Sequence, residues 1–227
     1  MHDPAESASR RGPTWDGVLS PNEYKPAVVR ARDALADAAR TARWDQVLGL
    51  LRDSAGVLQP DHWRVAGRSW FTPLHQAAWH GAPASVVDEL IALGASRTLH
   101  TADGRTARDI AAAAGHEALL PMLEPARRNP ADEDVLAVLD RHLNDLVEQR
   151  IRPQLTTELR PFPTGMLTEH ESGTRAWFPV PGMYGGFSIA LMRNYLDVES
   201  WSRVVGGSGQ AHVITVAGTV LVDEGFV

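Results

Sequence analysis

The sequence predicts an α+β protein in two parts: an N-terminal all-α stack of helical repeats, then an α+β module with a mostly antiparallel β-sheet. Three observations lead to this class. Similar segments recur about 34 residues apart in the first half, as in a solenoid. Residues 132–151 present one apolar face at helical spacing. Beyond Pro153, short apolar runs alternate with turns and no long helix separates them, which favours antiparallel pairing.

Residues 1–32 are expected to form an irregular N-terminal arm. Prolines and glycines interrupt this stretch repeatedly, and charged and small polar residues fill most of the rest. A few apolar side chains can attach part of the arm to a core: Trp15, Val18, Leu19 and Tyr24.

The ten residues Thr72–Gly81 carry the signals of one short helix. Thr72 can cap it by accepting a backbone N–H, and Pro73 suits the first helical position, where no N–H is needed. Gly81 can end the helix with a positive φ. Its apolar face comprises Leu74, Ala77 and Ala78. The segment resembles the T-P-L-H-x-A-A-x-x-G opening of an ankyrin repeat, a family that mostly builds protein-binding surfaces.

The resemblance implies about three ankyrin-like repeats over residues 33–125. The first is the weakest match, and an insertion over 53–68 separates it from the second. In the third, Ala-Arg-Asp replaces Pro-Leu-His, a departure that suits a terminal repeat. After the helix that begins at Thr72, the next helices are expected over 84–93, 107–114 and about 116–123.

Residues 126–131 are expected to form a linker, and residues 132–227 a helix with an antiparallel sheet. The helix covers 132–151, begins with three acidic residues that suit its positive N-terminal end, and ends before Pro153. Strands are expected at 155–159, 175–180, 186–192, 201–205, 211–216 and 219–222. The last two are joined by so few residues that a tight hairpin is predicted.

The composition excludes several classes of function. The chain has no cysteine, which excludes disulfides, cysteine-ligated zinc and thiol catalysis. No apolar run is long enough to span a membrane, and the N-terminus lacks the apolar region of a secretion signal, so we expect a cytoplasmic protein.

The net charge of −6 is concentrated in the second part of the chain. Residues 130–227 carry 13 acidic and 7 basic residues, whereas residues 1–129 carry 15 of each. Nucleic-acid binding is not expected, because it needs a cationic face. The acidic part suits a basic partner protein, although surface solubility explains it equally well.

The expected partner-binding residues lie where the concave groove and loop tips of ankyrin repeats fall. By this resemblance His75 belongs to the scaffold and hydrogen-bonds between repeats. Trp63, Trp70 and Trp79 form either a small packed core for the insertion or a contact patch. The candidate residues for contact with another protein are Arg40, Arg68, Trp70, Gln76, Trp79, His80 and Arg105.

Two glycine-rich segments in the second part form the alternative candidate site. Residues 179–187 and 206–210 are either structural bends or loops that let a ligand approach the backbone. If both lie at one end of the sheet, they frame a pocket. The candidate ligand-loop residues are Tyr184, Gly207, Ser208, Gln210 and His212.

Signals for catalysis and for metals are weaker. Ser208, His212 and Asp223 have the residue types of a hydrolytic triad, but no nucleophile elbow accompanies them. His212 with Asp223 and Glu224 has metal-ligating chemistry without a zincin spacing. We therefore expect no catalytic residue, no metal and no cofactor.

The sequence favours a non-catalytic protein that binds another protein through an ankyrin groove. One version is an inhibitor or immunity-type antidote of an intracellular protein. The alternative is a small enzyme or ligand-binding protein with a pocket between residues 181–187 and 206–210. A small ligand is not excluded by this pattern, but nothing in it indicates one.

Overall fold

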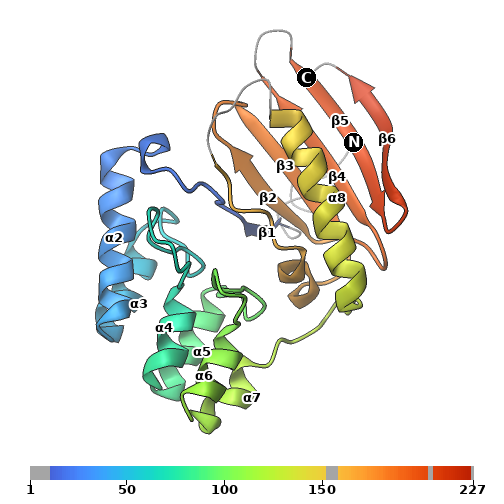
Figure 1. The fold of residues 1–227 in the computed structure, drawn as a ribbon. Coiled ribbons are helices and arrows are strands. Elements are labelled where there is room, and N and C mark those ends of the chain that lie inside the picture. The colour runs from blue at the N-terminus through green and yellow to red at the C-terminus, as the bar shows by residue number, and fades with distance from the viewer. Residues whose placement is uncertain (1–10, 152–157, 204–206, 226–227) are drawn as a thin grey trace. The chain divides into compact units, whose positions relative to one another are not determined.

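The computed structural model describes residues 11–151, 158–203 and 207–225 (Figure 1). The chain divides into two compact units. Residues 19–125 form a helical unit, and residues 1–18 join residues 126–227 in a sheet unit. Among the described residues, no helix is both long and apolar enough to cross a bilayer.

The helical unit consists of successive short helices that pack in two rows. α2, α4 and α6 contact one another in series, and α3 contacts α5 behind them. Buried leucine, valine, alanine and isoleucine side chains fill the space between the rows. The elements are η1 (Pro21–Glu23), α2 (Pro26–Arg40), α3 (Trp44–Asp53), α4 (Pro73–His80), α5 (Ala84–Ala92), α6 (Ala107–Ala113), η2 (Glu117–Leu119) and α7 (Leu120–Leu123).

The start and end signals of α4 act as the sequence predicts. The Thr72 hydroxyl accepts the His75 backbone N–H, while the His75 ring accepts the Thr72 backbone N–H, a reciprocal capping box. Gly81 ends the helix in the left-handed region at φ 60°. Thr106 and Asp109 form the same box at α6. The last helix expected, over about 116–123, is a 3₁₀ turn followed by one α-helical turn.

The sheet unit contains one six-stranded sheet in the order β1-β2-β3-β4-β5-β6. β2 to β6 form an antiparallel meander, which confirms the mostly antiparallel sheet and the α+β class. α8 crosses one face of the sheet (Figure 1) and packs on β5 and β6. The elements are β1 (Arg11–Thr14), α8 (Glu133–Ile151), η3 (Thr164–Glu169), β2 (Arg175–Val180), β3 (Gly185–Leu191), β4 (Leu196–Ser202), β5 (Ser208–Thr215) and β6 (Gly218–Gly225).

The N-terminal arm expected over residues 1–32 differs from the structure in its described part. Residues 11–14 are β1, which pairs in parallel with β2, and α2 already begins at Pro26. Trp15 is buried, and its indole N–H donates to the Arg160 carbonyl at 3.2 Å. Pro26 does not prevent helix formation, because it is the first residue of α2, a position whose backbone N–H has no partner within the helix.

The segment expected as a linker, 126–131, contains an anchored residue. Asn129 is buried, its side-chain amide donates to the Leu191 carbonyl at 2.9 Å, and its backbone N–H donates to the Thr168 carbonyl at 3.0 Å. These bonds attach the middle of the segment to η3 and β3 of the sheet unit.

The strand expected over 201–205 overlaps β4 only at residues 201 and 202, and residues 204 and 205 lie outside the described part of the chain. β4 runs from Leu196 to Ser202, and Leu196, Val198 and Ser200 are buried at every second position. The intervening Asp197 and Glu199 masked this alternation in the sequence, because two acidic residues reduce the apparent strand propensity. Most of the strand expected over 155–159 lies outside the described residues; Leu159 makes a single bridge to Val18.

The tight hairpin between the last two strands is confirmed. Thr215 pairs with Gly218 across a two-residue turn formed by Val216 and Ala217. β6 is the outermost strand on this side of the sheet, and all its residues after Gly218 are exposed.

Candidate functional site

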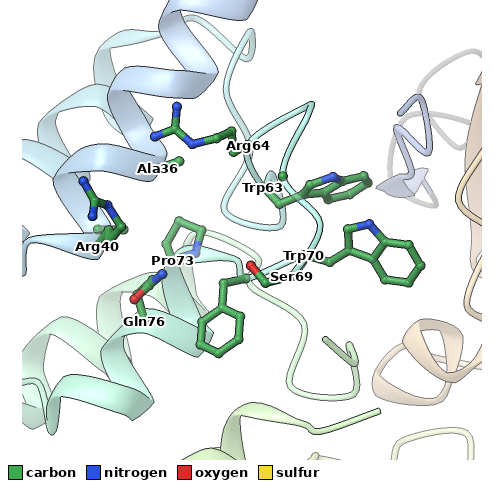
Figure 2. Close-up of a pocket in the computed structure, with 11 residues that line it drawn as sticks. Ala36, Arg40, Trp63, Arg64, Ser69, Trp70, Pro73 and Gln76 are labelled. Atoms are coloured by element: carbon green, nitrogen blue, oxygen red, sulfur yellow. The ribbon is translucent and has the colours of Figure 1, made fainter. Parts of the chain in front are cut away.

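A hollow in the helical unit lies between α2, the loop before α4, and α4 itself. Its volume is about 100 Å³, well below the roughly 300 Å³ at which small-molecule pockets begin. The hollow therefore suits a single side chain of a partner better than a free metabolite. Figure 2 shows its lining residues: Ala36, Ala39, Arg40, Trp63, Arg64, Gly67, Ser69, Trp70, Phe71, Pro73 and Gln76.

Ion pairs attach the loop before α4 to α2. The Arg64 guanidinium lies 3.0 Å from the Asp33 carboxylate and also donates to Asp37. These pairs span about 30 residues of chain, so local sequence patterns do not report them. Arg40 lies beside the same Asp37 at 3.7 Å, but most of its side chain is exposed.

Trp63, Trp70 and Trp79 do not form one cluster of equal exposure: they differ in how deeply each ring is buried. Trp63 is buried and packs its ring near the Arg32 guanidinium, which lies 5.3 Å from the ring centroid. Trp70 is half-buried on the rim of the hollow, at a left-handed φ of 57°. Trp79 is 53% exposed on α4. Burial in the core and exposure to solvent are therefore divided between different rings.

The predicted contact residues divide between the hollow and its surroundings. Arg40, Trp70 and Gln76 line the hollow, and Trp79 and His80 are exposed at the end of α4. Two others lie elsewhere: Arg68 is exposed in the loop but does not line the hollow, and Arg105 pairs with Asp103 before α6. Arg64 and Phe71 also line the hollow, and the sequence does not predict them as contact residues; Trp63, for which packing and contact are both open from the sequence, lines it too.

His75 is part of the scaffold, as the resemblance implied. Its ring is 1% exposed, Nδ1 accepts the Thr72 N–H at 3.2 Å, and Nε2–H donates to the Leu99 carbonyl at 3.1 Å. Both ring nitrogens are therefore used within the fold. His80 uses its Nε2–H on the Arg40 carbonyl at 3.0 Å, which connects α4 to the end of α2.

The first glycine-rich segment, residues 179–187, contacts the end of β4, which precedes the second segment in the chain. The Ser202 hydroxyl and the Arg203 backbone N–H both donate to the Met183 carbonyl, at 3.0 and 3.1 Å. Met183 is buried, whereas Tyr184 beside it is 78% exposed. Gly206 lies outside the described residues.

The remaining candidate ligand-loop residues are held by neighbours on the α8 side of the sheet. Arg150 of α8 donates to the Ser208 hydroxyl at 3.2 Å, and Gln210 donates to Glu224 at 2.6 Å. His212 is buried, and burial together with the nearby Arg150 lowers its pKa against a smaller opposing effect of Glu224.

The triad considered from the sequence is separated by strand geometry. Ser208 and His212 are four residues apart on β5, a rise of roughly 13 Å. Asp223 pairs with Ala211, the neighbour of His212 on β5. Because successive side chains of a strand point to opposite faces, Asp223 and His212 lie on opposite faces of the sheet. Within the described residues, no group of three or more His, Asp or Glu side chains is placed to hold a metal ion.

Comparison with known proteins adds no identity to this site. No protein-family model matches the chain, and no curated protein sequence is significantly similar to it.

Proposed function

We propose that residues 33–125 form an ankyrin-type repeat stack that binds a partner protein. The binding surface, called here the α2–α4 surface, comprises Arg40, Trp70, Gln76, Trp79 and His80. The observation that carries the proposal is the exposed indole of Trp79 on the same helix as a side-chain-sized hollow rimmed by arginine, glutamine and tryptophan. Tryptophan and arginine are the residues most often found at the energetic centres of protein interfaces.

The repeat assignment has local support beyond the sequence motif. The Thr72–His75 box, the bond from His75 to Leu99 and the left-handed Gly81 give each part of the T-P-L-H…G pattern a structural task. His116 donates to the Trp79 carbonyl at 3.2 Å, as His80 does to Arg40 one helix pair earlier. These repeated bonds satisfy carbonyls that helix ends leave without a partner.

The partner in the most specific form of the proposal is an intracellular protein that this chain inhibits, in the manner of an immunity protein. The charge distribution supports this form, since an acidic second part favours a basic partner.

The test is affinity capture from the native cell with the full chain and three variants. Trp79→Ala and Arg40→Ala are expected to reduce retention of a stoichiometric partner by about tenfold or more, with unchanged melting temperature. Tyr184→Ala, which truncates an exposed aromatic ring outside the surface, is the matched control and should retain the partner fully. Equal capture by all the variants would place the interface elsewhere.

A further inference from the structure

The outer strand of the sheet is open for pairing. β6 is the last strand in the order, and Val220, Leu221 and Val222 are 47–58% exposed. The strand holds neither lysine nor proline, the residues that usually protect such edges. Ala211 pairs with Asp223 and His212 with Leu221, so Val222 forms a bulge in β6. Within the described residues of the strand this is the one irregularity in its pairing. Such an edge is chemically complementary to another extended chain.

A hollow of about 510 Å³ lies at the C-terminal end of this strand. Two glycines form part of its floor: Gly209 of β5 pairs with Gly225 of β6 on one side and with Trp201 of β4 on the other. The Trp201 indole forms a wall. It stacks on Trp177 with 4.6 Å between ring centroids and 20° between planes, so its position is fixed by packing.

The charge around the hollow is mainly negative. Glu199, Asp223 and Glu224 line it together with Arg203. Glu199 already shares Arg175 with Asp197. Asp223 accepts the Glu224 backbone N–H, and no described residue forms an ion pair with it. The Glu224 side chain lies on the α8 side of the sheet, where it accepts from Gln210 and interacts electrostatically with Arg150. An indole face beside the Asp223 carboxylate, with Glu199 adding negative charge, is the chemistry that recognises a guanidinium group.

We propose that β6 pairs with an extended segment of a basic partner protein, and that an arginine of this segment occupies the hollow beside Trp201. The backbone of the segment would complete the β6 edge, and its apolar side chains would cover Val220 and Leu221. The occupant is a different protein and not a second copy, because a second β6 would bring two more carboxylates and no cation. This surface is separate from the α2–α4 surface, so either can fail without the other.

The experiment titrates the full chain with two blocked peptides of alternating valine and a second residue. That residue is arginine in one peptide and citrulline, its uncharged analogue, in the other. Binding is measured by calorimetry, and its location by amide hydrogen exchange. The arginine peptide should bind at least about tenfold more tightly than the citrulline peptide, weaken with added salt, and protect β6 amides from exchange.

Variants separate charge from edge pairing. Asp223→Asn should weaken binding of the arginine peptide by about tenfold, whereas Glu171→Gln, an exposed carboxylate of the same unit, should change nothing. Leu221→Lys, which protects the edge, should abolish binding. Equal affinity for both peptides, protection away from β6, or no binding would overturn the proposal. So would concentration-dependent self-association that Leu221→Lys removes, because the edge would then belong to a second copy.

Discussion

Gly81 ends α4 at a φ of 60°, and the His116 ring occupies the space where a side chain would stand. A Cβ built on Gly81 would lie 2.6 Å from two atoms of this imidazole. The same ring donates its N–H to the Trp79 carbonyl. One glycine therefore serves two purposes: it allows the left-handed turn and it admits the histidine that satisfies the helix end.

We predict that Gly81→Ala destabilises the chain by about 1 kcal/mol more than Gly115→Ala. Gly115 stands at the corresponding place in the next helix pair, with a φ of 75° and no atom within 4 Å of a built Cβ. Both substitutions incur the left-handed penalty and the same change in unfolded-chain entropy. Only Gly81→Ala must also displace His116. Urea unfolding of both variants measures the difference, and equal losses would show that the ring moves without cost.

His62 is a second residue with a consequence for the whole fold. It is buried in the loop before α4, and its Nδ1 accepts the Gln59 N–H at 3.2 Å. Burial lowers the pKa of His62 well below its usual 6.5, and the nearby charge of Arg32 lowers it further. Protonation in the folded state would place a second cation beside a buried arginine.

We predict that this histidine makes stability fall as the pH drops below about 6.5. Below that value the unfolded chain binds a proton that the folded chain does not, so unfolding is favoured by up to about 1.4 kcal/mol per pH unit until the folded pKa is reached. Above it the contribution of His62 is constant. His170 and His212, whose pKa values burial also lowers, act in the same direction.

The variant His62→Asn isolates this effect, because its side-chain oxygen can still accept the Gln59 N–H. Denaturant unfolding of both proteins at several pH values should show the wild-type stability falling more steeply between pH about 6.5 and 5. Parallel curves would mean that His62 is protonated in the folded state.

At the scale of elements, the sequence predicts best where the signals are local. α4 carries its own cap, first-position proline and terminal glycine, and the alternation in β2 predicts the range that the structure shows, Arg175–Val180. α8 begins one residue after the expected start and ends at the expected Ile151. In each case the deciding residues lie within the element or next to it.

The elements that the sequence missed depend on distant partners. β1 is a four-residue strand containing glycine and proline, and it is stabilised by a parallel partner more than 150 residues away. Similarly, the loop that carries Arg64 is attached to α2 by ion pairs, so the position of Arg64 in the lining of the hollow could not be inferred from its neighbours. Propensity and periodicity contain no information about such pairings.

At the scale of the whole molecule, the helical unit is inserted into the sheet unit. β1 and the buried Trp15 come first in the chain, residues 19–125 then form the helical unit, and the other strands of the sheet follow after residue 125. Trp15 packs edge-on against Phe162 with 6.5 Å between centroids, and the Arg160 guanidinium lies 4.9 Å from the Trp15 ring. The sheet unit therefore requires a segment that precedes the helical unit in the chain.

We predict that residues 1–18, joined to residues 126–227 by a flexible glycine–serine linker, fold cooperatively without the helical unit. Residues 126–227 alone should be less stable by about 3–5 kcal/mol, the usual cost of removing a buried tryptophan side chain. Trp15→Ala in the joined protein is the matched control, since it keeps the linker and the β1 backbone while removing the ring, and it should lose most of the same stability. Urea unfolding followed by circular dichroism compares the three. If residues 126–227 alone matched the joined protein, β1 and Trp15 would be attached to the sheet without stabilising it, and the helical unit would follow a dispensable arm after all.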